Sequence, residues 1–244
     1  MGFLSALAFL TIFPVPGRLL GGVETMPKAV KWFPVVGALI GAFAAGVAFL
    51  AFRFCPAPVA AVLAVLALAV AQGGLHLDGL ADTCDGFLSH RPRARVLEIM
   101  KDPHIGTFGV LGLVFILALQ FAAVFSLPAE RRLLAVLLAP ALGRAAIAPM
   151  LALLPAARPG GLGEMFAPGG RSPGVTRAAL CGALVFALPF VAFGPCVGAR
   201  VALGAGTVWC LFAAICRTKI GGYTGDTLGG ASELVETTVL LLAA

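Results

Sequence analysis

Long apolar stretches separated by short polar connections make up most of the chain. A helix that crosses a membrane needs about 20 predominantly apolar residues. Six stretches meet or approach that length, and a seventh has half of it: Trp32–Phe54, Ala57–Leu75, Thr107–Leu127, Leu133–Leu154, Ala178–Gly198, Val201–Ile215 and the short Ser232–Ala244. The pattern predicts an all-α, polytopic integral membrane protein with six to seven transmembrane helices in a single domain, residues 1–244.

The N-terminal stretch is apolar but too short to cross a membrane easily. Residues 1–13 lack the positively charged start of a signal peptide, and Pro14-Val15-Pro16-Gly17 ends them without a small-residue cleavage site. We therefore expect an interfacial or re-entrant helix at the N-terminus.

Composition supports a membrane rather than an aqueous environment. Of the 244 residues, 60% are hydrophobic and 11% are charged, and the mean hydropathy is +1.04. A soluble domain carries about 25% charged residues, so a water-soluble helical bundle is excluded. The net charge of +6 comes from basic residues in the connections, which indicates membrane topology rather than nucleic-acid binding.

The basic residues divide unevenly between the two sides of the predicted spans. Twelve lie in connections on one side: Arg18, Lys28, Lys31, Arg91, Arg93, Arg95, Lys101, Arg158, Arg171, Arg177, Arg217 and Lys219. Four lie on the other: Arg53, Arg131, Arg132 and Arg200. Because cytoplasmic connections carry the excess of Lys and Arg, we expect a multi-pass protein of the cell inner (plasma) membrane, with the first side in the cytoplasm.

Acidic residues are few, and three of them are closely spaced. Asp78, Asp82 and Asp85 follow one another at intervals of four and three, so a helix would place their carboxylates on one face. Like charges stacked in this way repel, and a hard divalent cation such as Mg²⁺ relieves the repulsion. The alternative is a solvated acidic turn.

A second acidic segment contains Asp226, followed by Glu233 and Glu236. Two glycines precede both acidic segments, in Gly73-Gly74-x-x-x-Asp78 and Gly221-Gly222-x-x-x-Asp226. Glycines and helix starts allow the backbone to approach a phosphate closely. A distant duplication, convergence on one geometry and chance all remain open as the origin of this pattern.

Several other polar residues are unusual for a membrane chain. All three histidines, His76, His90 and His104, fall within 29 residues of one another, and the stretch from Arg91 to Lys101 is typical of an amphipathic surface helix. Arg144 lies inside a predicted span, where a charge is costly. This position favours a side chain that faces a polar pocket, although a snorkelling side chain and a structural ion pair are alternatives.

A long connection rich in glycine and proline runs from Pro155 to Gly174 and carries Arg158, Glu164 and Arg171. It is either a lid over a site or a linker. Together, the acids and bases on one membrane face indicate metal-assisted transfer of a phosphate- or diphosphate-linked group. No Walker, Rossmann or hydrolase-elbow motif is present in the sequence to favour another class.

Five separated motifs resemble one family of membrane enzymes. They are AFLTIFPVPG near the N-terminus, LDGLADTCDGF at 77–87, KDPHIGTFGVLGL at 101–113, Gly143-Arg144, and GGYTGDTLGG at 221–230. In this order they resemble cobalamin synthase, the adenosylcobinamide-GDP ribazoletransferase family. The resemblance implies a Mg²⁺-dependent transferase that joins α-ribazole, or its 5′-phosphate, to adenosylcobinamide-GDP and releases GMP.

The resemblance also suggests roles for the residues singled out above. Asp78, Asp82, Asp85 and Asp226 are the expected metal ligands, with Glu236 as a helper and Glu233 as a weaker candidate. Asp82, Asp85 and His104 are the expected catalytic residues, with Asp85 or His104 as the base. The expected substrate-binding residues are Lys101, Arg144, Arg217, Lys219 and Thr224.

Other classes fit less well. The CDP-alcohol phosphotransferases also expel a nucleotide at a membrane face, but this chain lacks the Ala-Arg after their first Asp-Gly and their closing DxxxD. An aspartate-rich prenyltransferase is a further alternative. A transporter would place its polar site near the midplane, whereas these acids lie at one face. Membrane lipid is an expected partner, nucleic acid is not, and a homo-oligomer is compatible with the sequence.

Overall fold

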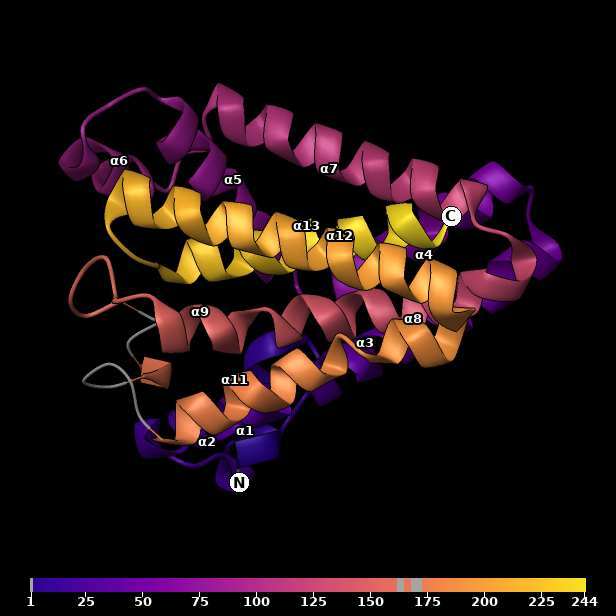
Figure 1. Cartoon of the computed structure of the whole chain (residues 1–244), viewed down its shortest axis with the longest axis horizontal. Coiled ribbons are helices and arrows are strands. Elements are labelled where there is room, and N and C mark those ends of the chain that lie inside the picture. Colours follow the sequence, from indigo (N-terminus) through magenta and orange to yellow (C-terminus); the bar gives the residue numbers. More distant parts are fainter. Residues whose placement is uncertain (1, 162–164, 168–172) are drawn as a thin grey trace.

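The computed structural model describes residues 2–161, 165–167 and 173–244, and the regular structure in these ranges is helical (Figure 1). The α-helices are α1 (Gly2–Leu10), α2 (Met26–Ala29), α3 (Phe33–Phe54), α4 (Ala57–Ala71), α5 (Leu75–Leu88), α6 (Arg93–Ile99), α7 (Thr107–Ser126), α8 (Ala129–Ala145), α9 (Ile147–Leu153), α11 (Pro173–Val185), α12 (Leu188–Ile220) and α13 (Gly225–Ala243). Short 3₁₀ turns join α1 to α3. The all-α prediction is confirmed.

Four helices are long and apolar enough to cross a membrane: Met26–Phe54, Thr107–Ser126, Ala129–Leu153 and Leu188–Ile220. The count becomes five if the bent pair α4 and α5 is one span. These numbers confirm a polytopic membrane protein. By length and composition, however, the described part of the chain has four or five spans rather than the expected six.

The second predicted span differs because the chain bends sharply at two glycines. Helix α4 ends at Ala71, and α5 leaves it at an angle of 89°. Gly73 and Gly74 both have positive φ values, 62° and 70°, a conformation that other residues adopt only at a cost. The bend places the acidic helix α5 across the polar end of the bundle instead of continuing α4.

The fifth predicted span, Ala178–Gly198, is also broken. Helix α11 ends at Val185, and within α12 Gly194 has φ 79° and ψ 171°. A Cβ on Gly198 would lie 2.5 Å from the Cα of Phe190, so the chain folds back on itself around Gly194. The residues after this break form the long arm of α12 that lies beside α13 in Figure 1.

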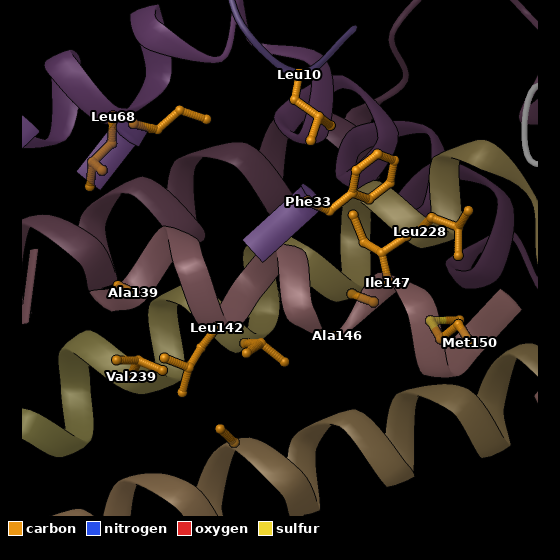
Figure 2. Close-up of a cluster of buried hydrophobic side chains, with 14 of the residues drawn as sticks. Leu10, Phe33, Leu68, Ala139, Leu142, Ala146, Ile147, Met150, Leu228 and Val239 are labelled. Atoms are coloured by element: carbon orange, nitrogen blue, oxygen red, sulfur yellow. The ribbon is translucent and has the colours of Figure 1, made fainter. Parts of the chain in front are cut away.

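The core is built around α8, which packs closely on α3. A Cβ on Gly37 would meet the Cα of Ala141 at 2.8 Å, and one on Gly41 would meet the Cα of Leu137 at the same distance. The two glycines therefore form the small-residue contact surface that their four-residue spacing predicts. Apolar side chains from α3, α8, α9 and α13 converge around this contact (Figure 2).

The outer surface is apolar. The side chains of Leu184, Val191 and Leu203 are 73%, 86% and 72% exposed. Large apolar side chains in such numbers on the surface indicate lipid as the surrounding solvent.

The two ends of the bundle differ in chemistry. Helices α5 and α6 and the start of α13 lie at one end, and the C-terminus lies at the other (Figure 1). At the C-terminal end, Arg131 donates to the carbonyl of Ala243 at 2.9 Å. At the α6 end, Arg93 donates to the carbonyl of Ile220 at 2.7 Å. Arg131, from the group of four basic residues, and Arg93, from the group of twelve, thus lie at opposite ends of the bundle, as the distribution of basic residues along the sequence predicts.

Candidate active site

Helices α5 and α13 pack against each other at the polar end of the bundle. Gly79 makes the close approach possible, because a Cβ there would lie 2.7 Å from the carbonyl oxygen of Asp226. The two acidic segments identified in the sequence therefore meet in space. Asp78 lies in the first turn of α5 and Asp226 in the first turn of α13.

A capping box holds the start of α13. The backbone N–H of Thr227 donates to the hydroxyl oxygen of Thr224 at 3.2 Å, and the Thr227 hydroxyl accepts from the Thr224 N–H at 2.8 Å. The Thr224 hydroxyl in turn donates to Asp226 at 3.1 Å. Thr224 is buried, so its geometry supports positioning of Asp226 rather than the predicted substrate contact.

Three carboxylates form the acidic cluster of this site, defined here as Asp78, Asp82 and Asp226. Asp78 is exposed, and the other two are half-buried. The negative charges of Asp226, Asp78 and Asp85 all act on Asp82. Like charges that are near one another and partly buried repel, and a positive charge beside them relieves this repulsion.

Arg158 is the cation that the protein itself supplies. It forms an ion pair with Asp226 at 3.3 Å and donates to the carbonyl of Leu97. The backbone before it is fixed to the segment preceding α13, because Ala157 N–H donates to the Tyr223 carbonyl at 2.8 Å. The sequence indicated only that Arg158 lies in a connection, because its partner, Asp226, is 68 residues away.

That connection was predicted to be a lid or a linker. Its first residues carry Arg158 to the acidic cluster. Glu164 and Arg171, also noted in the sequence, lie outside the described residues.

Asp85 contacts the start of α7. Its two carboxylate oxygens accept the backbone N–H groups of Gly106 and Gly109, at 2.7 and 2.8 Å. These groups belong to the first turn of α7, whose own N-cap residue is glycine and offers no side chain. Asp85 therefore caps α7 and complements its dipole. Each oxygen keeps a further lone pair, so the roles of Asp85 as base and metal ligand stay predictions.

Lys101 and His104 have different surroundings in the structure. Lys101 lines a cavity of about 190 Å³ together with Asp78 and Asp82, which suits its predicted role toward phosphate. The imidazole of His104 is 90% exposed, and its Nδ1 lies 2.8 Å from Asp102. Hydrogen bonds from the His104 backbone and ring lower the pKa of Asp102. His104 itself does not line that cavity, although its neighbours Pro103 and Ile105 do, and its role as base stays a prediction.

Two predicted phosphate ligands lie in the last turn of α12. Arg217 is exposed, and Lys219 donates to the carbonyl of Phe87 in α5 at 3.2 Å. Both lie at the polar end of the bundle, but neither lines a cavity that contains the acidic cluster. Their substrate roles stay predictions.

Arg144 and Glu236 form a buried ion pair inside the bundle. Their side chains are 0% and 1% exposed. Arg144 also donates to Gln72 at 2.5 Å, and Gln72 donates to Glu233 at 2.9 Å. From α7, Gln120 donates to Glu233 and Thr237, each at 3.1 Å. The structure therefore favours the structural alternative for Arg144 over a phosphate contact, with Glu236 as its ion-pair partner. The metal role of Glu236 stays a prediction.

The acidic cluster fits a hard divalent cation. Within the described residues, no group of three or more His, Cys, Asp or Glu side chains already has the geometry of a metal cage. Mg²⁺ does not require one, because it keeps several waters and binds through one or two carboxylates and substrate phosphates. The oxygen donors of Asp78, Asp82 and Asp226 are of the type that this ion prefers.

Fold and site together define a polytopic membrane protein with a cluster of carboxylates at one end of its helical bundle. The model of the family described as cobalamin-5-phosphate synthase matches residues 2–244. The chain belongs to this family.

Similar proteins carry the name adenosylcobinamide-GDP ribazoletransferase. One from Klebsiella pneumoniae is 41% identical over 243 residues, which cover 98% of this chain and 97% of the relative. One from Roseiflexus is 41% identical and covers 96% and 86% of the two chains, and one from Clostridium botulinum is 36% identical and covers 98% and 96%. No solved structure matches the chain.

The buried pair leads to a stability prediction. Arg144→Met leaves Glu236 buried without its partner, so we expect a loss of about 3–5 kcal/mol in ligand-free stability. The double variant Arg144→Met/Glu236→Met removes both charges and should recover most of that loss. Thermal melting of detergent-solubilised protein measures both. Wild-type melting of Arg144→Met, combined with weaker donor binding, would instead establish Arg144 as a substrate ligand.

Proposed function

We propose that the chain joins α-ribazole, or its 5′-phosphate, to adenosylcobinamide-GDP and releases GMP, which is the nucleotide-loop assembly step of cobalamin synthesis. The observation that carries the proposal is the acidic cluster where α5 meets α13, with Lys101 and Arg158 beside it. The names of the similar proteins supply the substrates. This full-length similarity also favours the ribazoletransferase reaction over CDP-alcohol or prenyl transfer and over transport.

In the proposed reaction, a ribose hydroxyl of the acceptor attacks the phosphorus on the corrinoid side of the donor diphosphate. The new O–P bond forms as the bond to the GMP oxygen breaks, and the hydroxyl proton goes to a carboxylate. We assign this proton to Asp82, because its carboxylate lines the same cavity as Lys101, where the donor phosphates would lie. Asp85 is less suited, since its oxygens are engaged at α7.

Asp78, Asp82 and Asp226 would hold Mg²⁺. When bound, the ion neutralises phosphate oxygens and the departing GMP. Lys101 would bind phosphate through its ammonium group from the cavity that it shares with Asp78 and Asp82. Arg158 would hold Asp226 in place and add positive charge near the donor.

We place the protein in the cell inner membrane with this site in the cytoplasm, as the basic residues predict. In a cysteine-free variant in sealed cells, Ser89→Cys, just after α5, should resist a membrane-impermeant thiol reagent. Glu130→Cys, at the start of α8, is the matched control and should react. The reverse labelling pattern would overturn the orientation.

Activity tests the proposed reaction directly. Purified protein with adenosylcobinamide-GDP, α-ribazole and Mg²⁺ should release GMP. Asp82→Asn keeps the shape of the side chain but removes its charge, so we expect kcat to fall by about 10²–10⁴-fold with normal melting. Glu98→Gln changes an exposed acid on α6 whose partner is Arg95 and should keep wild-type activity. Full activity of Asp82→Asn with unchanged Mg²⁺ dependence would contradict the site assignment.

A further inference from the structure

A second cavity, of about 110 Å³, is lined by Asp78 and Asp226 of the acidic cluster but not by Lys101. Its apolar walls come from four parts of the chain that are distant in sequence. The side chains of Leu10, Phe33, Ile147 and Leu228 converge there (Figure 2). The cavity is thus a small, mostly apolar chamber next to the carboxylates of the acidic cluster.

Aromatic rings form one wall of this chamber. Phe166 lies between two other phenylalanines, with ring centroids 4.9 Å from Phe9 and 5.3 Å from Phe33. Both pairs meet edge to face, at interplanar angles of 65° and 78°. Such walls favour a flat aromatic ring, because edges and faces of the rings attract one another. Phe166 is 3% exposed, so it closes the chamber from the connection that follows α9.

The opposite wall is polar. It contains His76, Asp78 and Asp226. His76 is 4% exposed, and its buried Nδ1 has no hydrogen-bond partner among the described residues. A buried nitrogen without a partner is costly, and a hydrogen-bonding atom on an occupant of the chamber is a partner that would satisfy it.

Asp78 connects the two cavities, because it lines both the aromatic chamber and the cavity that contains Lys101. A molecule with an aromatic ring at one end and a reacting hydroxyl at the other would span this arrangement. Its ring would fill the chamber, and its hydroxyl would reach the carboxylates, while phosphate groups would lie toward Lys101.

We propose that the aromatic chamber is the subsite for the base of the acceptor nucleoside, and that Phe166 determines its selectivity for a fused aromatic base. The proposal rests on the proposed function, since it names the place of one substrate of that reaction. Phe166 acts in it as a specificity-determining residue and takes no part in the bond changes.

The test compares two acceptors, α-ribazole and an α-riboside whose base is a single imidazole ring. In the wild type, α-ribazole should have the lower KM. Phe166→Leu removes one aromatic contact, so the KM for α-ribazole should rise about three- to tenfold. The KM values for the imidazole riboside and for adenosylcobinamide-GDP should change little. Phe3→Leu is the control, because that ring pairs with Trp32 at 5.6 Å and does not line the chamber.

Binding provides a second readout that does not need turnover. α-Ribazole alone should raise the melting temperature of the wild type and of Phe3→Leu, and should raise it much less in Phe166→Leu. Equal KM changes for both acceptors, a change confined to the donor, or no change at all would each overturn the subsite. Absence of protection by α-ribazole in the wild type, as expected for a chamber that holds a lipid chain, would overturn it too. GMP release without discrimination between the acceptors would refute only the subsite, whereas no GMP with either acceptor would refute the proposed function.

Discussion

The buried ion pair between Arg144 and Glu236 is the interaction on which the rest of the structure depends. In a bundle surrounded by lipid, water is not at hand to satisfy a charge, so each buried polar group needs a partner within the protein. The pair recruits Gln72 and Glu233, and through Glu233 it reaches Gln120. The network therefore joins α7, α8 and α13 to the end of α4. Because breaking it would leave buried polar groups without partners, it restricts these helices to one relative placement.

This placement sets the geometry of the candidate site. Glu236 lies ten residues after Asp226 on the same helix, about 15 Å along its axis, so fixing Glu236 fixes the start of α13. Gln72 immediately precedes the two glycines at which the chain bends into α5. The network thus holds both acidic helices from the bundle interior, while their carboxylates stay at the polar end. Two other acidic residues have structural partners: Asp85 caps α7, and Glu236 neutralises Arg144.

The sequence predicted what depends on local pattern. Apolar runs placed α3 and α7 within a residue or two of their ends, and the spacing of Gly37 and Gly41 predicted a close helix contact. The acidic spacing in α5 predicted a shared face. What it did not predict depends on backbone conformation or on distant partners. Gly73 and Gly74 could have continued a helix at a modest cost, and only their positive φ values reveal the bend.

The candidate site was predictable to a similar degree. The family resemblance grouped Asp78 and Asp226 as metal ligands, and the structure brings their helices together, but the sequence did not predict the partners of individual side chains. Arg144 finds Glu236 92 residues away, and no local signal separates a structural arginine from a substrate ligand. Asp85 was grouped with its neighbours by spacing, although Gly106 and Gly109, which accommodate its carboxylate, are visible in the sequence. Arg158 was missed because its role arises only when its connection folds against the start of α13.

We propose that the cation lies between α5 and α13 and not in the polar network of the bundle interior. Mn²⁺ can replace Mg²⁺ and scatters X-rays anomalously, so a crystal of the protein with Mn²⁺ and adenosylcobinamide-GDP would locate the ion. We expect an anomalous peak within about 2–2.5 Å of carboxylate oxygens of Asp78, Asp82 or Asp226, with none beside Glu233 or Glu236. A peak at the two glutamates, with the acidic cluster empty, would contradict it.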